Sequence, residues 1–304
     1  MKELHPCALT IDLEDWYQGI ALPSEYWHLF EKRLFIGLER ILTLLSRRKL
    51  KATFFLLGKA IEEHPDLIWQ ILKEGHEIGC HTYAHLELYK MSPLSFEADL
   101  QQCQDLIAPF GATYTGFRAP YFSLEQRSWW AIGLLKKHFD YDSSIYPGDN
   151  KRTGIKGYRK DLHFLCDSLV EAPVSTFSFL HYDLGLGGAY FRILPFSVFW
   201  HHMQKCLRQA PGVFYLHPWE MDPQQPYLNR LASRIRFPHY FNLESTEKRL
   251  ALLLDQVEFV PLNQVVSSFR SAQTEQTFCL NDQSEVRIPL PKYNPALSYP
   301  FLME

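Results

Sequence analysis

Short apolar segments alternate with helix-patterned segments along most of the chain, and this alternation is the feature that most constrains the fold. Residues 7–12 and 52–58 have the composition of buried strands. Each is followed by a segment with apolar residues at helical spacing, over 29–47 and 60–75. Repeated strand–helix units predict an α/β architecture with a sheet of parallel strands.

Polar side chains gather directly after several of the predicted strands. These clusters are Asp12 to Asp15, His81 with His85, Arg118 to Tyr121, and His217 to Glu220. In folds built from parallel strands, chemistry takes place on the loops at the carboxyl ends of the strands. We therefore expect the four clusters to converge on one functional site.

Composition excludes several classes of protein. The chain has 304 residues, of which 46% are hydrophobic, so it can bury a substantial core. The net charge is only −3 and there is no basic stripe, so nucleic acid is not an expected partner. Aromatic residues make up 15% of the chain, which is compatible with a carbohydrate ligand held against aromatic rings.

The sequence also predicts a compartment. No apolar run approaches the roughly 18 residues of a membrane span, and the N-terminal residues contain no apolar core of a signal peptide. The six cysteines are scattered and show no C-x-x-C spacing, as expected of free thiols in a reducing compartment. We predict a cytoplasmic protein.

The segment GHEIGCHTYAH, residues 75–85, contains two histidines four positions apart, His81 and His85. This spacing can direct both imidazole rings at one ion. The carboxylates of DLED, residues 12–15, are costly to bury without a nearby cation or arginine. Two imidazoles and one carboxylate form an open site for zinc or a similar divalent ion, with the remaining positions left for water or substrate.

A hydrolytic metal site also needs proton-transfer groups. A second carboxylate of the same cluster can act as the general base. Arg118 can hold that carboxylate in its ionised form. His217, at the end of a late strand, can act as the general acid.

Four motifs carry a resemblance to a known family. TIDLED, HTYAH, RAPY and LHPW occur in that order, and with them the chain resembles the polysaccharide deacetylase family, the NodB-homology group of carbohydrate esterases, over about residues 7–220. DLEDW, YDSS, EAPVST and GGAYFR resemble a branch of that family found in exopolysaccharide gene clusters. The resemblance implies a distorted, incomplete (β/α) barrel, which we place over 1–270, with a C-terminal extension over 271–304.

The resemblance also implies a role for individual residues. Asp12 would be the general base, Arg118 would orient it, and His217 would be the general acid. Three residues would hold the metal, usually zinc in this family: Asp15, His81 and His85. The backbone N–H of Tyr121 would help to hold the oxyanion, and Tyr121 and Trp219 would border the sugar.

The chain departs from the family pattern at two places. The acidic pair is adjacent in the family, whereas Leu13 and Glu14 separate the two aspartates here. If the strand pleat continued past Asp12, Glu14 would share its face; we expect Asp15 to be the ligand, on the assumption that the strand ends in a turn. FDYDSS replaces the aspartate that tunes the acidic histidine, which leaves Asp142 as a candidate. Arg192 in GGAYFR is a candidate substrate contact.

These features predict a metal-dependent amidohydrolase that removes an acetyl group from an N-acetylated amino sugar in a glycan or its precursor. A second hypothesis is hydrolysis of a small cyclic amide or ureide, as in allantoinase-like relatives of the same fold. A third is a non-catalytic glycan-binding barrel.

Overall fold

The computed structural model describes residues 3–20, 22–148, 153–180 and 182–280. The chain divides into a large unit, Met1–Ser268, and a second unit, Phe269–Glu304. Helix α10 (Leu262–Leu280) begins in the first unit and continues into the second. The sequence lacks helical periodicity from about residue 273, yet the chain is helical as far as Leu280. Residues 281–304 of the predicted extension lie outside the described residues, so the division at 270/271 stays a prediction.

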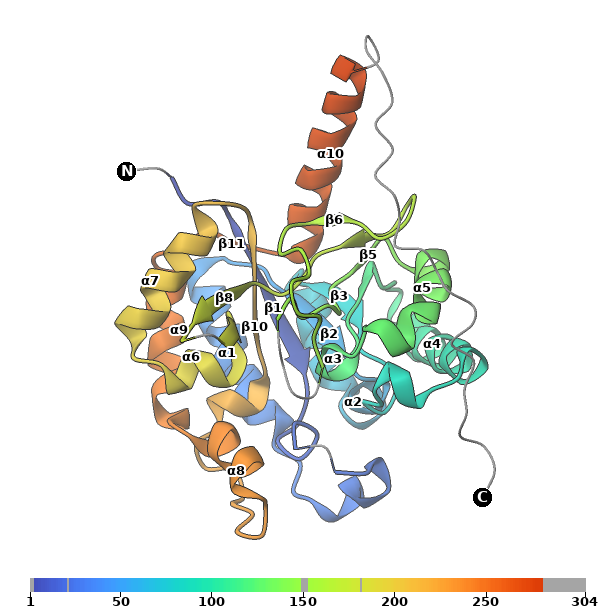
Figure 1. Cartoon of the computed structure of the whole chain (residues 1–304). Coiled ribbons are helices and arrows are strands. Elements are labelled where there is room, and N and C mark those ends of the chain that lie inside the picture. The colour runs from blue at the N-terminus through green and yellow to red at the C-terminus, as the bar shows by residue number, and fades with distance from the viewer. Residues whose placement is uncertain (1–2, 21, 149–152, 181, 281–304) are drawn as a thin grey trace. The chain divides into compact units, whose positions relative to one another are not determined.

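A sheet of mostly parallel strands forms the centre of the large unit (Figure 1). Its order is β10-β1-β2-β3-β4-β5-β7-β6, with β11 also paired to β1. The bounds are β1 (Cys7–Leu13), β2 (Thr53–Leu56), β3 (Glu77–Cys80), β4 (Gly116–Phe117), β5 (Tyr141–Asp142), β6 (His163–Phe164), β7 (Val170–Glu171), β10 (Gly212–Leu216) and β11 (Phe259–Val260). Of these pairs only β6 and β7 are antiparallel among the described strands. The predicted α/β class is confirmed, and the sheet curls into part of a barrel (Figure 1).

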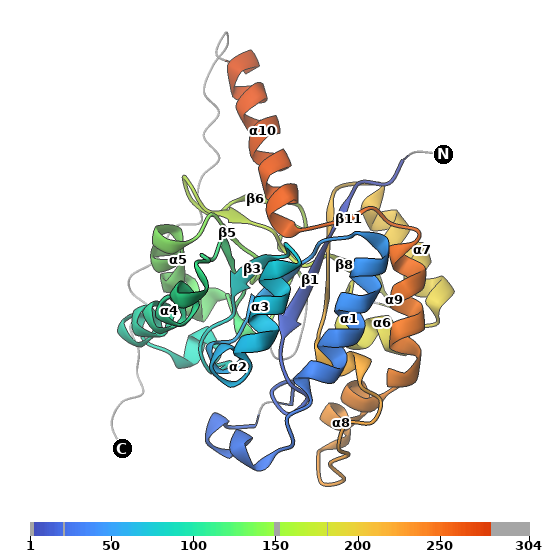
Figure 2. The ribbon, with the colours of Figure 1, turned by 180° about the vertical axis from the view of Figure 1, so that it is seen from behind.

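Helices cover the outer face of the curled sheet, and α1, α3 and α9 are in front of the strands in Figure 2. The bounds are α1 (Leu34–Arg48), α2 (Gly58–Glu63), α3 (Pro65–Lys73), α4 (Pro93–Ile107), α5 (Ile132–His138), α6 (Gly188–Ile193), α7 (Phe196–Leu207), α8 (Ser233–Tyr240) and α9 (Thr246–Leu254). A separate antiparallel pair consists of β8 (Thr176–Phe179) and β9 (Tyr182–Gly185). Among the described residues, none of the helices is both long and apolar enough to span a bilayer.

One predicted helix is two helices in the structure. The apolar period over 60–75 is divided between α2 and α3 at His64, which has φ −139° and ψ 56°. Pro65 cannot donate a backbone hydrogen bond to the preceding turn and disfavours helical torsions at the residue before it. Pro65 is instead the first residue of α3, where its missing N–H costs nothing.

The pleat of strand β1 directs its side chains alternately into the apolar core and toward a polar face. Its odd-numbered residues, Cys7, Leu9, Ile11 and Leu13, belong to the apolar core. The even-numbered Thr10 and Asp12 contact the Arg118 guanidinium on the opposite face. Side chains alternate along a strand with a period of two, so Glu14, the residue after Leu13, continues the polar face. This alternation determines which acidic residue enters the site.

Candidate active site

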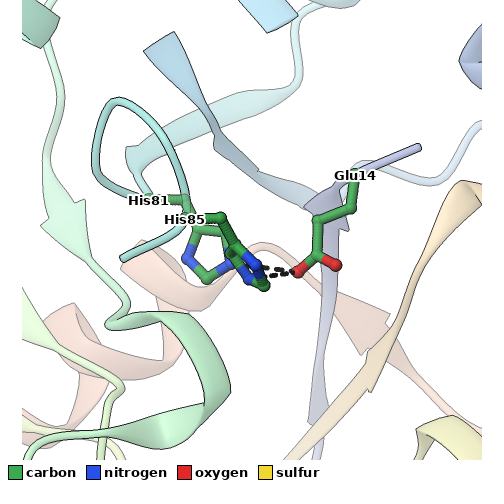
Figure 3. Close-up of side chains that lie close together, drawn as sticks. All are labelled: Glu14, His81 and His85. Carbon is green, nitrogen blue, oxygen red and sulfur yellow. Dashed lines mark hydrogen bonds and ion pairs between the residues drawn. The ribbon is translucent and has the colours of Figure 1, made fainter. Parts of the chain in front are cut away.

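Glu14, His81 and His85 form a compact buried cluster, drawn in Figure 3. Glu14 follows β1 and His81 follows β3, so the carboxyl ends of the two strands bring them together. Oε1 of Glu14 lies 3.2 Å from Nε2 of His81 and 2.9 Å from Nε2 of His85. One carboxylate oxygen and two imidazole nitrogens thus face a single point, which is a donor set for a divalent cation.

The hydrogen bond at the far side of the His81 ring determines its tautomer. Nδ1 of His81 lies 2.6 Å from the backbone carbonyl oxygen of Arg118, which can only accept, so Nδ1 carries the proton and donates it. In the neutral ring, Nε2 then presents a lone pair toward the Glu14 carboxylate, which also presents lone pairs. A cation between the two groups would accept both lone pairs. An imidazole whose other N–H donates a hydrogen bond is usual for a metal ligand.

His85 supplies independent support for a cation. Its side chain is buried, yet neither ring nitrogen has a partner with hydrogen-bond geometry among the described residues. Ligand atoms about 2.0–2.1 Å from one tetrahedral ion lie about 3.3 Å apart, close to the 2.9 and 3.2 Å separations from Glu14. The residues present therefore fit a small divalent metal ion.

The electrostatics of Glu14 are set by burial and by the neighbouring imidazoles. Burial alone would raise the pKa of this carboxyl. The charges of His85 and His217 and the close approach of the His81 and His85 rings outweigh that effect and hold the pKa of Glu14 well below its usual range. Glu14 is therefore an ionised ligand at neutral pH.

The structure places Asp15 elsewhere, which corrects the expectation that it would face the histidines. Its carboxylate accepts hydrogen bonds from the backbone N–H groups of Trp16, Arg33 and Leu34. Burial raises the pKa of Asp15 to about 6, although these backbone bonds lower it. The physical reason is the pleat of β1, which continues through Leu13 and brings Glu14 to the polar face, so that Asp15 points toward the start of α1.

Asp12 and Arg118 form a buried ion pair beside this cluster, as the sequence predicts. Nη1 of Arg118 donates to Oδ1 of Asp12 at 2.7 Å and to the hydroxyl of Thr10 at 2.8 Å. The guanidinium also donates to the carbonyl and the hydroxyl of Ser143. Asp12, Glu14 and His217 offer a second set of possible metal ligands, but Arg118 already engages one oxygen of Asp12, which suits a held base better than a ligand.

His217 lies close to both Asp12 and Glu14. Its Nε2 is 3.8 Å from Oδ2 of Asp12 and 3.8 Å from Oε1 of Glu14. Its Nδ1 lies 2.8 Å from Oε1 of Glu220. Burial would lower the pKa of this imidazole, but the charge of Glu14, the hydrogen bond and charge of Glu220, and the charge of Asp12 raise it to about 9. Such a group carries a proton at neutral pH.

Two further expectations are corrected by the structure. Asp142 does not contact His217: its carboxylate accepts from the Ser144 hydroxyl and lies beside Glu171 on the neighbouring strand. Arg192 is fully buried and bonds Glu220 at 2.8 Å, so it is not a substrate contact. Its segment GGAYFR forms the start of α6 rather than a loop, although the predicted glycine torsions are present, with φ +144° at Gly187.

A cavity of about 710 Å³ opens beside these groups. Asp12, Glu14 and His217 line it together with six aromatic side chains: Tyr121, Phe122, Tyr146, Tyr190, Tyr215 and Trp219. Tyr121 and Trp219, which are predicted to border the sugar, line this cavity. Tyr121 has left-handed torsions, φ 55° and ψ 22°, and its ring centroid lies 4.4 Å from that of His85. An aromatic wall beside polar groups suits a sugar ring, which has both apolar faces and hydroxyls.

Sequence reasoning missed Glu220 and ranked Glu14 below Asp15. The local pattern of Glu220 was visible, because a carboxylate three residues after His217 can accept from the backbone N–H at the start of a helical turn. That bond is present at 3.1 Å. The bond to the imidazole depends on the side-chain torsions within this turn, which a linear pattern does not specify.

Comparison with known protein families matches two segments of the chain, and residues 1–36 lie outside both. Residues 37–137 match the family model described as polysaccharide deacetylase. Residues 143–267 match a family described as a domain of unknown function, DUF3473. His81, His85 and Arg118 lie in the first segment, and His217 and Glu220 lie in the second.

Curated relatives match parts of the chain. A chitin deacetylase of Pestalotiopsis sp is 28% identical over 142 residues, 44% of this chain and 48% of that protein. A peptidoglycan-N-acetylglucosamine deacetylase of Bacillus cereus is 35% identical over 94 residues, 30% of this chain and 34% of that protein. The chain thus spans about half of the first relative and about a third of the second.

A solved structure shares the fold over nearly the whole chain. It comes from Mycobacterium smegmatis and is described as a candidate polysaccharide deacetylase. It aligns with a TM-score of 0.60 at 18% identity and covers 96% of this chain and 97% of that chain. The predicted NodB-type α/β fold with an incomplete barrel is confirmed.

Proposed function

The chain carries a polysaccharide deacetylase domain, and from this premise we propose that it is a metal-dependent hydrolase that removes N-acetyl groups from amino sugars in a polysaccharide or its precursor. The chitin and peptidoglycan deacetylases that it resembles support an N-acetylated amino sugar as the substrate. We keep zinc as the expected metal and the cytoplasm as the expected compartment.

One observation carries this proposal. Glu14 of the two-histidine, one-carboxylate cluster, the arginine-held Asp12 and a protonated His217 line one aromatic cavity. The groups of this site come from the last residues of β1 and from the loops after β1, β3, β4 and β10, which lie far apart in the sequence and meet at the carboxyl end of the sheet. Hydrolysis of an amide needs these three functions together.

Glu14, His81 and His85 would hold the metal. A bound divalent cation supplies Lewis acidity, which polarises the acetyl carbonyl and acidifies a water molecule. The other groups transfer protons. Asp12, held in place by Arg118, accepts a proton from the attacking water while the water oxygen bonds to the carbonyl carbon. His217 donates the proton on Nε2 to the amide nitrogen as the C–N bond breaks and its electron pair stays on nitrogen. Acetate and the free amino sugar are the products.

The predicted role of the Tyr121 backbone N–H in holding the oxyanion stays a prediction. The left-handed torsions of Tyr121 at the cavity wall agree with a specialised backbone position. Trp219 and Tyr121 would pack against the sugar ring.

Acetate release from N-acetylglucosamine oligomers, with metal-loaded and metal-stripped protein, tests the proposal. We expect release only from the loaded protein. Asp12→Asn should retain the metal but lose about 10²–10⁴-fold in kcat, because an amide oxygen can still accept from Arg118 but cannot take the water proton. Metal content by mass spectrometry separates the two effects. Glycan binding without acetate release at any metal loading would favour a non-catalytic barrel, and full activity of Asp12→Asn would overturn the mechanism.

A further inference from the structure

His217 is supported by a carboxylate that the family resemblance does not supply. We infer that Glu220, itself held by Arg192, is the positioning residue that keeps His217 in the tautomer and orientation needed to protonate the leaving amine. This inference rests on the proposed function. It gives Glu220 the role of tuning His217, for which the family resemblance made Asp142 the candidate.

The hydrogen bonds of Glu220 leave little freedom to His217. One oxygen, Oε1, accepts from Nδ1 of His217 at 2.8 Å and from its backbone N–H at 3.1 Å. An ionised carboxylate only accepts, so Nδ1 must donate, and Nε2 is the atom that remains for proton transfer. Nε2 is the nitrogen on the side of Asp12 and Glu14. Glu220 therefore leaves Nε2 as the nitrogen of His217 that donates the proton.

Arg192 holds the second oxygen of Glu220. Its Nε donates to Oε2 at 2.8 Å, and both side chains have 0% exposure. Its terminal nitrogens donate to the backbone carbonyls of Pro238, His239 and Phe241, at and after the end of α8. A buried carboxylate is strongly destabilising without such a partner. Arg192 thus keeps Glu220 charged and anchors it between α6 and α8.

Ring stacking restrains the plane of the His217 imidazole. The ring stacks on Trp219 with centroids 5.2 Å apart and planes inclined by 21°. Trp219 in turn stacks on His239 at 4.2 Å and 15°. Glu220 holds Nδ1 and Trp219 packs against one face of the ring, so Nε2 has one favoured direction.

All of these supporting residues lie within 143–267, the segment that matches a domain of unknown function. The metal-binding cluster and Arg118 lie before residue 143. The second segment therefore supplies the acid together with its support, the first supplies His81, His85 and Arg118, and Asp12 and Glu14 precede both segments. We infer that the second segment is an integral part of the catalytic unit.

The test compares Glu220→Gln with a matched control on two substrates. Asp222→Asn is the control, because Asp222 is a buried carboxylate two residues away that pairs with Arg33 and does not line the cavity among the described residues. One substrate is an N-acetylglucosamine oligomer, whose amine must be protonated to leave. The other is 4-nitrophenyl acetate, whose phenolate leaves without a proton.

We expect Glu220→Gln to lower kcat on the amide by about 10²-fold and on the ester by less than about threefold, with metal content unchanged. Asp222→Asn should keep kcat on both substrates within about threefold of the wild-type values. Glu220→Asp, which keeps the charge but shortens the side chain, should retain part of the amide activity, and it replaces Glu220→Gln if that variant does not fold. Equal loss on both substrates, or no loss, would overturn the inference.

A measurement without turnover separates this inference from the proposed function. In metal-free protein with ¹⁵N-labelled histidine, NMR should show the Nδ1–H proton of His217 in the wild type and in Asp222→Asn but not in Glu220→Gln. Persistence of that signal in Glu220→Gln would contradict the positioning role. Absence of acetate release from wild-type protein, with the NMR result as expected, would instead count against the proposed deacetylase activity.

Discussion

At the scale of single residues, the identity of the acidic ligand depends on a one-residue difference in the β1 pleat. The sequence DLED contains three carboxylates, and each is a chemically reasonable metal ligand. Asp12 and Glu14 share one face because two positions separate them, whereas Asp15 turns toward the first residues of α1. The backbone N–H groups that Asp15 accepts from give it a structural role at the start of that helix.

This difference leads to a paired prediction. Glu14→Gln should lower metal affinity by more than the roughly 10–100-fold typical of losing an outer-shell partner, because it removes a charged ligand. Asp15→Asn should retain the metal but lower the free energy of unfolding by about 1 kcal/mol, because it disturbs hydrogen bonds at the start of α1. Titration with zinc and urea unfolding measure the two effects. Metal loss in Asp15→Asn with retention in Glu14→Gln would reverse the assignment.

The residue types in the sequence predicted the chemistry of the site, but they did not predict which side chains contact one another. His81, His85, Asp12, Arg118 and His217 do lie together, because Asp12 is near the end of β1 and the others follow strands of the same sheet. Glu220 and Arg192 form their contact through the packing of α6 against the turn after β10. No spacing rule links residues 28 positions apart in two different elements, so this pair was not predictable.

At the scale of elements, short strands at the far edge of the sheet bury a second acidic pair. Asp142 on β5 and Glu171 on β7 are paired in register, and both are fully buried. Burial, the Asp142 charge and the hydrogen bond with Asp142 raise the pKa of Glu171 well above its usual range. Its Oε1 accepts from the backbone N–H of Ile145. Glu171 therefore holds its proton to higher pH than a free glutamate does.

This pair predicts a pH dependence of stability. A carboxyl whose folded pKa is raised stabilises the protein fully below its unfolded pKa, about 4.3 for Glu, and the contribution is lost as the pH rises through the folded pKa. Glu171→Gln keeps a neutral hydrogen-bonding group that does not titrate, so its stability should not fall with pH for this reason. We expect the free energy of unfolding of the wild type to fall relative to Glu171→Gln with increasing pH, by up to about 1.4 kcal/mol per pH unit.

Urea unfolding over a pH series measures this effect. Glu97→Gln, on the exposed side of α4, is the control and should give a curve parallel to that of the wild type. A Glu171→Gln curve that is also parallel would show that Glu171 does not hold a proton in the folded state.

At the scale of the whole molecule, the proposed metal would connect loops that are distant in the sequence. Glu14 and His81 are separated by 67 residues and meet only in the folded chain. A ligand that binds only the folded state stabilises it, by about 2.7 kcal/mol at a hundredfold excess over Kd. For a unit of this size we expect zinc to raise Tm by about 5 °C.

Thermal unfolding with and without zinc tests this expectation. His81→Ala should show no comparable rise, because it lacks one of the two imidazoles. Asp222→Asn, which leaves the cluster intact, should keep the rise. An equal rise in His81→Ala would mean that zinc binds elsewhere on the protein.

The sequence by itself determined the α/β class, the placement of polar clusters after strands and the chemical types needed for hydrolysis. These features follow from local periodicity and from residue chemistry, which are encoded within short segments. The tertiary structure alone decided that Glu14 rather than Asp15 faces His81 and His85, and that Glu220 rather than Asp142 holds His217. The reason is geometric: the direction of a side chain depends on where a strand's pleat ends and on how distant elements pack, and neither is fixed by spacing along the chain.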